Sequence, residues 1–439
     1  MVGMKDAGAA KVADRIEAGD PQYLNWAPSS VLIDQDDQFQ FGWRAEHAGR
    51  RGAGLPVRSF KSKLWDDPAA LLESALRGSG GSFTFEECLT SYLAYLCNVT
   101  DGALVRAGHA THVSRRYAMP YAYDDERRSV RERLGTLLWR GAILSDSLGD
   151  MLRTGVEAGL MRAALDAVAD VATPSWFFDA ELPCIGEPVA AVGFAMREDA
   201  SQLAVYMIID IGAGTTDYCI LCVKNRLDGA TEPIQIRDGS LSVPIAGDQV
   251  DEALLGFVEE NFGPEAEALF RANARLYKER LFVDGTVRLD LEDGTPVDFD
   301  RSNFLADRRW REFVEALQAA QLACFRKADQ TYLTRYGSGA VRVVLTGGGA
   351  ALPLDDALCI GRTEGGTGIG RERVDALPLA LRDQYAAIET LLPRLIVSLG
   401  GSFPSQPKEL DRSGARTSNG QPPRRVYQPF DKATAGLDR

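Results

Sequence analysis

The stretch that decides the fold is Val205–Val223, which reads VYMIIDIGAGTTDYCILCV. Its first half is an unbroken apolar run that ends at Asp210, and a second apolar run begins after Asp217. Between the two acids lies Gly-Ala-Gly-Thr-Thr, so the pattern predicts two buried strands joined by a tight turn. Such a turn presents backbone N–H groups and two hydroxyls together, and it can therefore hold phosphate oxygens.

The residue types of this turn fit a phosphate group and a metal ion. Glycine adopts backbone angles that are closed to other residues, so several amides can point at one anion. The candidate phosphate-binding residues are Gly212, Ala213, Gly214, Thr215 and Thr216. Asp210 and Asp217, one at each mouth of the turn, would hold Mg²⁺ through its waters. A glycine hairpin flanked by solvated acids is the alternative for the turn taken by itself.

A second glycine-rich stretch follows another apolar run. Ala340–Leu345 reads as a buried strand that continues into Thr346-Gly-Gly-Gly-Ala-Ala-Leu-Pro353. Three glycines between a strand and a helix let the backbone approach a flat ligand or its phosphates, and the helix N-terminus favours negative charge. We expect Gly347, Gly348 and Gly349 to contact a nucleotide, and this corner to face the first one across a cleft.

Two further stretches could reach a phosphate. Lys61 and Lys63 lie in a largely apolar segment and are candidates for a phosphate contact, although solvated surface lysines explain them equally well. Glu187 and Pro188, with small residues behind them, are an ordinary signal for a helix start. The same glutamate could equally place a functional carboxylate beside a ligand.

Length and composition set the class of protein. With 439 residues, of which 45% are hydrophobic, the chain is long enough for two lobes, each with its own core. Its net charge of −13 disfavours nucleic acid or an anionic membrane surface as a partner. No apolar run reaches membrane-spanning length, and the first residues lack the apolar core of a signal peptide. We therefore expect a soluble, cytoplasmic protein that binds neither nucleic acid nor membrane.

The seven cysteines are scattered through mostly apolar surroundings, as is typical of reduced thiols in a core. Cys219 and Cys222 form a Cys-x-x-Cys, but on a strand this spacing places the two side chains on opposite faces. We expect no metal or redox role for this pair.

The rest of the chain mixes helical and strand patterns, which predicts an α/β architecture. Apolar spacing predicts helices over residues 68–76, 84–99, 124–167 (with breaks near Gly141, Gly149 and Gly155), 246–261, 265–281, 309–336 and 378–399. Strands are predicted over residues 30–34, 113–119, 232–236, 241–245, 286–291 and 295–298. From Phe403 the chain is rich in Pro, Ser, Arg and Gly and lacks periodicity, so we expect a disordered tail.

Taken in order, these landmarks resemble the actin-like ATPase superfamily, and specifically the nucleotide-binding domain of heat-shock protein 70, the DnaK-type chaperone. The resemblance spans about residues 28–402 and lies in a series of motifs, since one glycine motif is weak evidence. The series is Lys61, Pro120, Glu187-Pro188 with Ala190-Ala191, Asp210–Asp217, Ala246–Asp251 and Gly347–Pro353.

The resemblance implies an α/β, actin-like ATPase (ribonuclease H-like) fold with two lobes around a nucleotide cleft. Lobe I would span residues 1–203, lobe II residues 204–402, and the disordered tail residues 403–439. The family's first phosphate hairpin, Asp-x-Gly-Thr-Thr, should precede Trp26 and is missing, so lobe I is expected to be truncated at its N-terminus. Either the recorded start is too late or the protein is a short form; we favour the first, because losing two central strands would expose a sheet edge.

By the same resemblance, the cofactors are ATP and Mg²⁺. Lys61 would stabilise charge on the phosphates, and Glu187 and Asp210 would orient metal and water. Thr215 and Asp217 would serve phosphate and metal, since electrostatic stabilisation by fixed groups dominates phosphoryl transfer. The ribose and base would contact Gly247, Lys278 and the Gly347 turn. In three places where the family has an arginine, a serine and an arginine, this chain has Glu279, Phe282 and Ala351.

Three functions follow from these expectations. The leading one is a chaperone-type ATPase, similar to heat-shock protein 70, that couples ATP binding and hydrolysis to lobe closure and signals to a protein partner or client. It would act without the family's peptide-binding domain, and hydrolysis would require the first hairpin. The second is a nucleotide-binding or interaction module without turnover, and the third, ranked lowest, is an actin-like filament protein. P-loop enzymes are excluded, because no Gly-Lys-Ser/Thr occurs.

Overall fold

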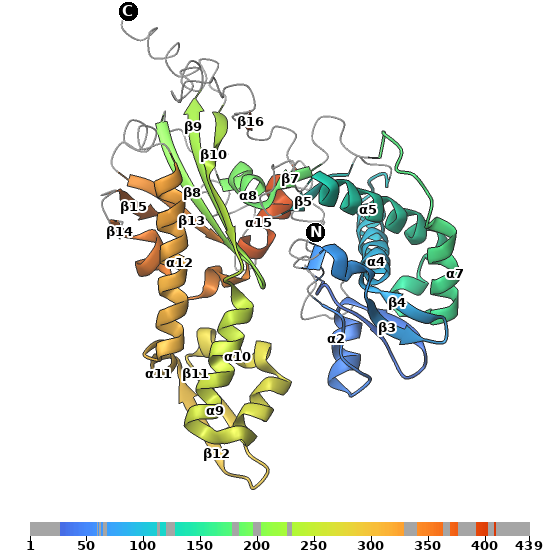
Figure 1. The fold of residues 1–439 in the computed structure, drawn as a ribbon, viewed down its shortest axis with the longest axis horizontal. Coiled ribbons are helices and arrows are strands. Elements are labelled where there is room, and N and C mark those ends of the chain that lie inside the picture. The colour runs from blue at the N-terminus through green and yellow to red at the C-terminus, as the bar shows by residue number, and fades with distance from the viewer. Residues whose placement is uncertain are drawn as a thin grey trace, which may run out of the picture.

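A computed structural model describes residues 27–58, 60, 63–64, 68–111, 115–119, 128–177, 184–195, 203–225, 231–328, 340–362, 369–375, 392–402 and 408–409. The predictions that concern Lys61, Pro120 and residues 1–26 lie outside these residues. Helices and strands alternate along the chain, which confirms the α/β class (Figure 1).

The largest sheet has seven strands in the order β14-β15-β13-β8-β9-β10-β16. The predicted hairpin forms its centre: β8 pairs antiparallel with β9, and Asp210 is the register partner of Asp217. On its other side β8 pairs parallel with β13, with Asp210 opposite Thr346. The strands are β8 (Leu203–Ile211), β9 (Thr216–Asn225), β10 (Thr231–Val243), β13 (Ala340–Thr346), β14 (Gly361–Arg362), β15 (Gly370–Arg373) and β16 (Lys408–Glu409).

The two faces of this sheet are both apolar and pack on different helices. Along β8, Val205, Met207 and Ile209 join one core cluster, whereas Tyr206 and Ile208 join another. This alternation follows the period of two residues of a strand. The first face packs on α9 (Gly247–Ala272) and α12 (Arg308–Lys327), and the second on α8 (Glu187–Ala195) and α15 (Leu392–Gly401), which lie side by side in Figure 1.

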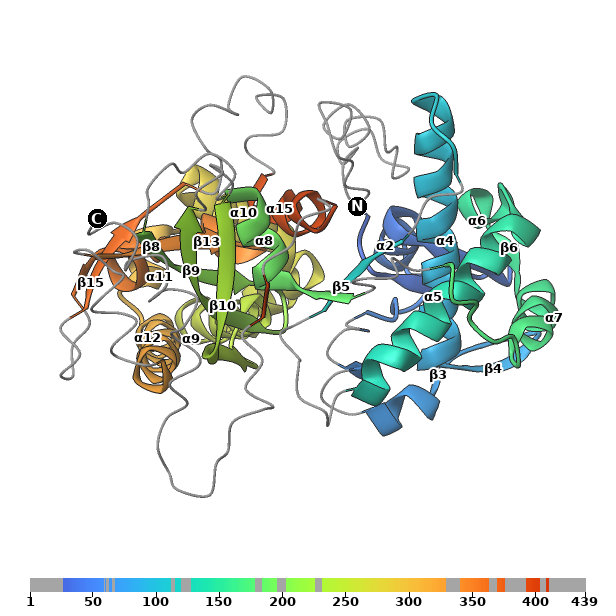
Figure 2. The same ribbon diagram turned by 90° about the horizontal axis from the view of Figure 1, so that it is seen from above.

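A separate core forms from the first part of the chain. It gathers Phe39, Phe41, Phe83, Tyr92 and Tyr95 between a small sheet and three long helices. Figure 2 shows α4 and α5 crossing this region beside α7. Its elements are β1 (Val31–Ile33), β2 (Gln38–Phe41), α2 (Gly42–Arg50), η2 (Pro68–Leu72), β3 (Ser74–Gly78), β4 (Gly81–Thr84), α4 (Phe85–Arg106), α5 (Arg128–Leu148), α6 (Met151–Thr154), β6 (Val156–Glu157) and α7 (Ala158–Val168).

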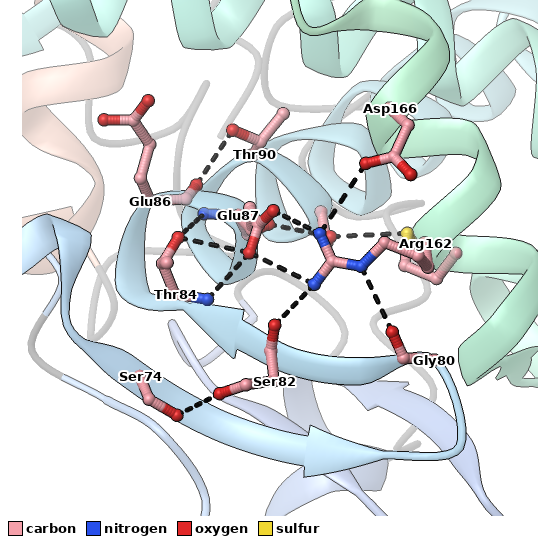
Figure 3. Close-up of polar contacts among 11 residues, drawn as sticks. Ser74, Gly80, Ser82, Thr84, Glu86, Glu87, Thr90, Arg162 and Asp166 are labelled. Atoms are coloured by element: carbon pink, nitrogen blue, oxygen red, sulfur yellow. Dashed lines mark hydrogen bonds and ion pairs between the residues drawn. The ribbon is translucent and has the colours of Figure 1, made fainter.

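The N-terminus of α4 explains how this region is held together (Figure 3). The Thr84 hydroxyl accepts from Glu87 N at 3.2 Å, and the Glu87 carboxylate accepts from Thr84 N at 2.8 Å, which is a capping box. Arg162 of α7 forms an ion pair with Glu87 and donates to the carbonyl of Ser82 at 2.6 Å. The guanidinium therefore ties the β3–β4 hairpin, α4 and α7 into one unit.

Two short parallel strands connect the two cores. β5 (Tyr117–Met119) pairs with β7 (Cys184–Gly186), and β7 leads directly into α8. Next to β5, Arg116 donates to the carbonyl of Gly401, the last residue of α15, at 2.8 Å. The remaining elements extend α9: α10 (Ala274–Asp284), β11 (Thr286–Asp290), β12 (Pro296–Asp300) and α11 (Arg301–Leu305).

Several sequence predictions about individual elements are wrong. Residues 68–76 form a 3₁₀ turn and a strand rather than a helix. The two strands predicted over 232–236 and 241–245 are one strand with a bulge between Ile236 and Ser240. Gly141 does not break α5; its added Cβ would lie 3.0 Å from Ala94 N, so this glycine lets α5 approach α4 closely.

The structure leaves the lobe boundaries and the disordered tail as predictions. Within the predicted tail, Lys408–Glu409 pairs parallel with β10, and the other residues from 403 onward lie outside the described part of the chain. Cys219 and Cys222 join different core clusters, which confirms that they point to opposite faces. In the described part of the chain, no helix is both long and apolar enough to cross a bilayer.

Candidate active site

The turn between β8 and β9 rests on the N-terminus of α9. Gly247 N donates to the carbonyl of Gly212 at 3.1 Å, and Asp248 N donates to the carbonyl of Ala213 at 2.8 Å. These two bonds direct the carbonyls of the turn toward the helix. The N–H groups of Ala213, Gly214 and Thr215 donate to no acceptor within the described residues. Three consecutive amides are therefore available to an anion.

Gly212 has a different role from the one predicted. Its φ lies outside the left-handed region, so it is not required for its backbone angles. An added Cβ would instead approach the carbonyl oxygen of Thr215 to 3.1 Å, and the Gly212 N–H donates to that same oxygen at 2.9 Å. The glycine keeps the turn tight.

The two hydroxyls of the turn behave differently. Thr215 donates to Asp217 Oδ2 at 3.3 Å, at the mouth of the turn. Thr216 is fully buried and donates to the carbonyl of Ile245 at 2.5 Å. Thr216 therefore fixes the strand that leads into α9, and Thr215 is the hydroxyl closer to the acids.

Thr346, Asp210 and Asp217 form a polar row across three neighbouring strands. Asp210 is the register partner of both Thr346 on β13 and Asp217 on β9, so all three share one face. They are 0%, 7% and 1% exposed, respectively, in strands whose other buried positions are largely apolar. This row is on the face that packs on α8 and α15, since Tyr206 and Ile208 of β8 have the same parity as Asp210.

The second glycine corner lies next to the first on the same sheet edge. Gly347 has φ +80°, and an added Cβ would lie 2.3 Å from the carbonyl oxygen of Ile211. A Cβ on Gly349 would lie 2.3 Å from Ile211 Cγ2, whereas one on Gly348 would meet no atom of the described residues within 4 Å. Parallel neighbouring strands end at one edge, which explains why the corners are neighbours rather than opposite walls of a cleft. The expected helix after the corner is only a 3₁₀ turn, η4 (Gly348–Ala351), so the helix-dipole argument does not apply here.

α9, α10 and α15 converge on these corners. Lys278 Nζ of α10 lies 2.7 Å from Asp251 Oδ1 and donates to the carbonyl of Gly247 at 3.3 Å. The next residue, Glu279, forms an ion pair with Arg394 of α15 at 3.1 Å. The Gly347 N–H donates to the carbonyl of Pro393 at 2.8 Å. The structure thus brings Gly247, Lys278 and the Gly347 turn into one region; their contact with a ribose and base stays a prediction.

Glu187 is in the first turn of α8, the helix that packs on the same face as the polar row. It thus belongs to an element next to the carboxylates, although it is distant from them in sequence. Lys61, the other residue expected at the phosphates, lies outside the described residues.

The oxygen atoms of the row suit a magnesium ion. Mg²⁺ prefers oxygen ligands and keeps several waters, so one or two carboxylates are sufficient to hold it. Buried carboxylates placed opposite each other repel, and a cation relieves that repulsion. A cage of three or more His, Cys, Asp or Glu side chains does not occur within the described ranges.

Sequence reasoning missed three residues of this arrangement. The sequence motifs alone do not single out Thr346, Asp251 or Arg394. The signal for Thr346 was present, since it is a polar residue at the end of an otherwise apolar strand. Nothing in the sequence pattern pairs Arg394 with Glu279, because the contact depends on how α15 packs.

Comparison with known proteins gives the fold family. No protein-family model matches the chain. Over 194 residues the chain is 28% identical to the cell shape-determining protein MreB of Pasteurella multocida and 29% identical to that of Haemophilus influenzae. MreB is an actin-like ATPase. The fold of this chain is that of the actin-like ATPases.

The matched region is 40% of this chain and 49% of each relative, so the chain spans about half the length of the curated relatives it matches. The superfamily prediction is confirmed. The narrower prediction, the heat-shock protein 70 branch, gains no support, because the relatives found are cell shape-determining proteins.

Proposed function

We propose that this chain is an actin-like nucleotide-binding protein that takes ATP with Mg²⁺ at the two glycine corners. The observation that carries this proposal is the polar row beside both corners: two buried carboxylates on adjacent strands, next to a turn with three available amides. Buried acids in direct register are costly to a fold by themselves, and they are useful where a cation binds.

The amides and the carboxylates suit different parts of the ligand. The N–H groups of Ala213–Thr215 would donate to the terminal phosphates, and Asp210 and Asp217 would hold the waters of the magnesium ion. Gly348, whose Cα faces open space, would let the ligand approach the backbone. Bound Mg²⁺ would supply charge neutralisation on the phosphates.

Lys278 and Gly247 would form the ribose side of the site. The ammonium group is held by Asp251 and by the carbonyl of Gly247, so it has a fixed position next to the turn. Beyond it, the Glu279–Arg394 ion pair occupies the position where the resemblance expects an arginine on the base. This exchange supports the alternative in which nucleotide binds without turnover.

For hydrolysis, we propose the roles that the resemblance implies. Asp210 and Glu187 would orient metal and attacking water, and Lys61 would stabilise charge on the transferred phosphate. A protein partner or client would respond to closure around the nucleotide. The similarity to MreB favours the third alternative, a filament protein, more than the sequence motifs alone do, because both relatives are actin-like.

Calorimetric titration of ATP, with and without Mg²⁺, tests the proposal. We expect saturable binding that is tighter with the metal. Gly348→Val should abolish it, because the new side chain would fill the backbone approach while meeting no protein atom near its Cβ. The unfolding temperature of this variant should match that of the wild type, which separates a blocked site from a damaged fold.

Two further measurements distinguish the alternatives. Phosphate release separates an ATPase from a binding module, and sedimentation with ATP separates a filament from both. If Gly348→Val binds ATP with the affinity of the wild type, the glycine corner is not the site and the proposal is wrong.

A further inference from the structure

Thr346 has a buried hydroxyl that the described fold does not use. Its side chain is 0% exposed, and Oγ1 has no hydrogen-bond partner in the described part of the chain. A buried hydroxyl without a partner is unfavourable, so structures generally retain one only where something else requires it. Valine has nearly the same shape and would avoid this cost, yet the position carries threonine.

The position of Thr346 indicates what requires the hydroxyl. It is the register partner of Asp210 on the neighbouring parallel strand, and their side chains leave the sheet on the same face. The next residue is Gly347, and a Cβ there would lie 2.4 Å from Asp210 Oδ1. The carboxylate of Asp210 therefore lies over the backbone that follows Thr346.

The surroundings of Thr346 exclude a simple packing role for its oxygen. Val344, two residues before Thr346 and on the same face of β13, belongs to the apolar cluster that also contains Ile396 and Leu399 of α15. Apolar neighbours stabilise the methyl group of threonine but offer its hydroxyl no hydrogen-bond partner. The polar groups nearest in register are those of the row.

We propose that Thr346 is a positioning residue of the magnesium site, a role that rests on the proposed function. With the metal bound, its hydroxyl would donate to the Asp210 carboxylate or accept from a metal-bound water, and would so fix the carboxylate for the ion. Groups that orient a metal ligand in this way commonly change metal affinity about 10- to 100-fold when removed.

The test compares three variants of the full-length chain. Thr346→Val removes the hydroxyl at nearly constant shape, Thr346→Ser keeps it, and Thr90→Val is the matched control. Thr90 is also a buried threonine, 3% exposed, but its hydroxyl donates to the carbonyl of Glu86 at 2.9 Å, far from the row in the α4 helix. ATP affinity is measured calorimetrically over a Mg²⁺ titration and again in EDTA.

We expect Thr346→Val to need about tenfold more Mg²⁺ for tight ATP binding, with its affinity in EDTA unchanged. Thr346→Ser and Thr90→Val should follow the wild-type Mg²⁺ dependence. In thermal unfolding without ligand, Thr346→Val should be at least as stable as the wild type, because it loses an unpartnered hydroxyl, whereas Thr90→Val should be less stable.

Two results would overturn this assignment. If Thr346→Val keeps the wild-type Mg²⁺ dependence, the hydroxyl has no role at the metal. If its affinity falls equally with Mg²⁺ and in EDTA, the substitution disturbs the corner as a whole. In both results the wild type still binds ATP. Failure of the proposed function looks different, because the wild type itself would then bind no ATP. In that case the assignment of Thr346 would be wrong as well.

Discussion

Two groups of acidic side chains in this protein, one in each core, are arranged in opposite ways. In the first core, Glu87 pairs with Arg162, Glu86 pairs with Arg133, and Asp101 accepts from Arg115. In the second, Asp210 and Asp217 lie in direct register with each other on neighbouring strands and are more deeply buried. An acid in contact with a base stabilises a fold, whereas two acids in register repel each other, and a bound cation would relieve that repulsion.

The difference distinguishes polar groups that hold the fold together from candidate ligand-binding groups without reference to sequence motifs. Arg162 and Glu87 join a hairpin and two helices, and every polar contact in Figure 3 is made within the protein. The row of Thr346, Asp210 and Asp217 is at a sheet edge beside amides that the described residues do not use. We therefore expect variants of the Glu87–Arg162 pair to change stability and variants of the row to change ligand binding.

The largest effect is expected at Asp210. Asp210→Asn should lower ATP hydrolysis by about 100- to 1000-fold, because it removes fixed charge from the metal and phosphate site. Unfolding in denaturant should change little. Glu187→Gln should act in the same way, and phosphate release at the wild-type rate by either variant would refute the assigned roles.

The next effect separates two adjacent glycines. Gly347→Ala combines a left-handed φ with a Cβ only 2.3 Å from the carbonyl oxygen of Ile211, so it should lower the free energy of unfolding by about 3 kcal/mol. Gly348→Ala meets no atom within 4 Å and should be tolerated by the fold. Chemical denaturation measures both, and equal stability of the two variants would show that Gly347 does not contact the end of β8.

In the first core, Arg162→Ala should lower the free energy of unfolding by about 2 kcal/mol, since it leaves Glu87 and the carbonyl of Ser82 without their partner. Affinity for ATP should not change. A loss of nucleotide binding with no loss of stability would contradict the division between the two cores.

Glu87 adds a dependence on pH. Burial raises its pKa, but hydrogen bonds from Arg162 and Thr84 outweigh this, so the pKa of the Glu87 carboxyl is lower than usual. A depressed pKa gives stability that is present above the ordinary glutamate value and is lost as the pH falls below it. The stability difference between wild type and Glu87→Gln should thus be largest near pH 7 and shrink below about pH 4. A difference that stays constant over this range would exclude the ion pair as its source.

The smallest effect is expected for the Glu279–Arg394 ion pair, whose side chains are each 32% exposed. A double-mutant cycle with Glu279→Gln and Arg394→Gln should give a coupling energy of about 0.5 kcal/mol in unfolding. A coupling energy several times larger would indicate that this ion pair holds α10 and α15 together. The ion pair would then close the side of the site where the base is expected.

Much of the fold could be predicted from local patterns. The hairpin around Gly212 is flanked by long apolar runs, and Thr84 with Glu87 marks the start of α4 as a capping box. Such features depend on residues close in sequence. The pattern over residues 68–76 predicts a helix where the structure has a 3₁₀ turn and the start of β3, because a five-residue, partly exposed strand has too little alternation to override a helical pattern.

The site could be predicted as a set of residues but not as an arrangement. That Thr346 adjoins Asp210 depends on the parallel pairing of strands separated by more than a hundred residues. The hydrogen bond from Thr216 to the carbonyl of Ile245 and the ion pair between Arg394 and Glu279 likewise depend on tertiary packing. The local sequence identifies which carboxylates, hydroxyls and glycine turns the chain contains. The order of strands in the sheet decides which of them are neighbours.

The most direct test of the central claim is thermal unfolding of the wild type and Asp217→Asn with ATP plus Mg²⁺, with ATP plus EDTA, and with neither. If the carboxylate row and the glycine corners bind the metal-bound polyphosphate, a saturating ligand should raise the wild-type midpoint by about 3 °C or more, and further with Mg²⁺ than with EDTA. Asp217→Asn should show no added effect of Mg²⁺. A wild type that unfolds at the same temperature in all three conditions would contradict the account.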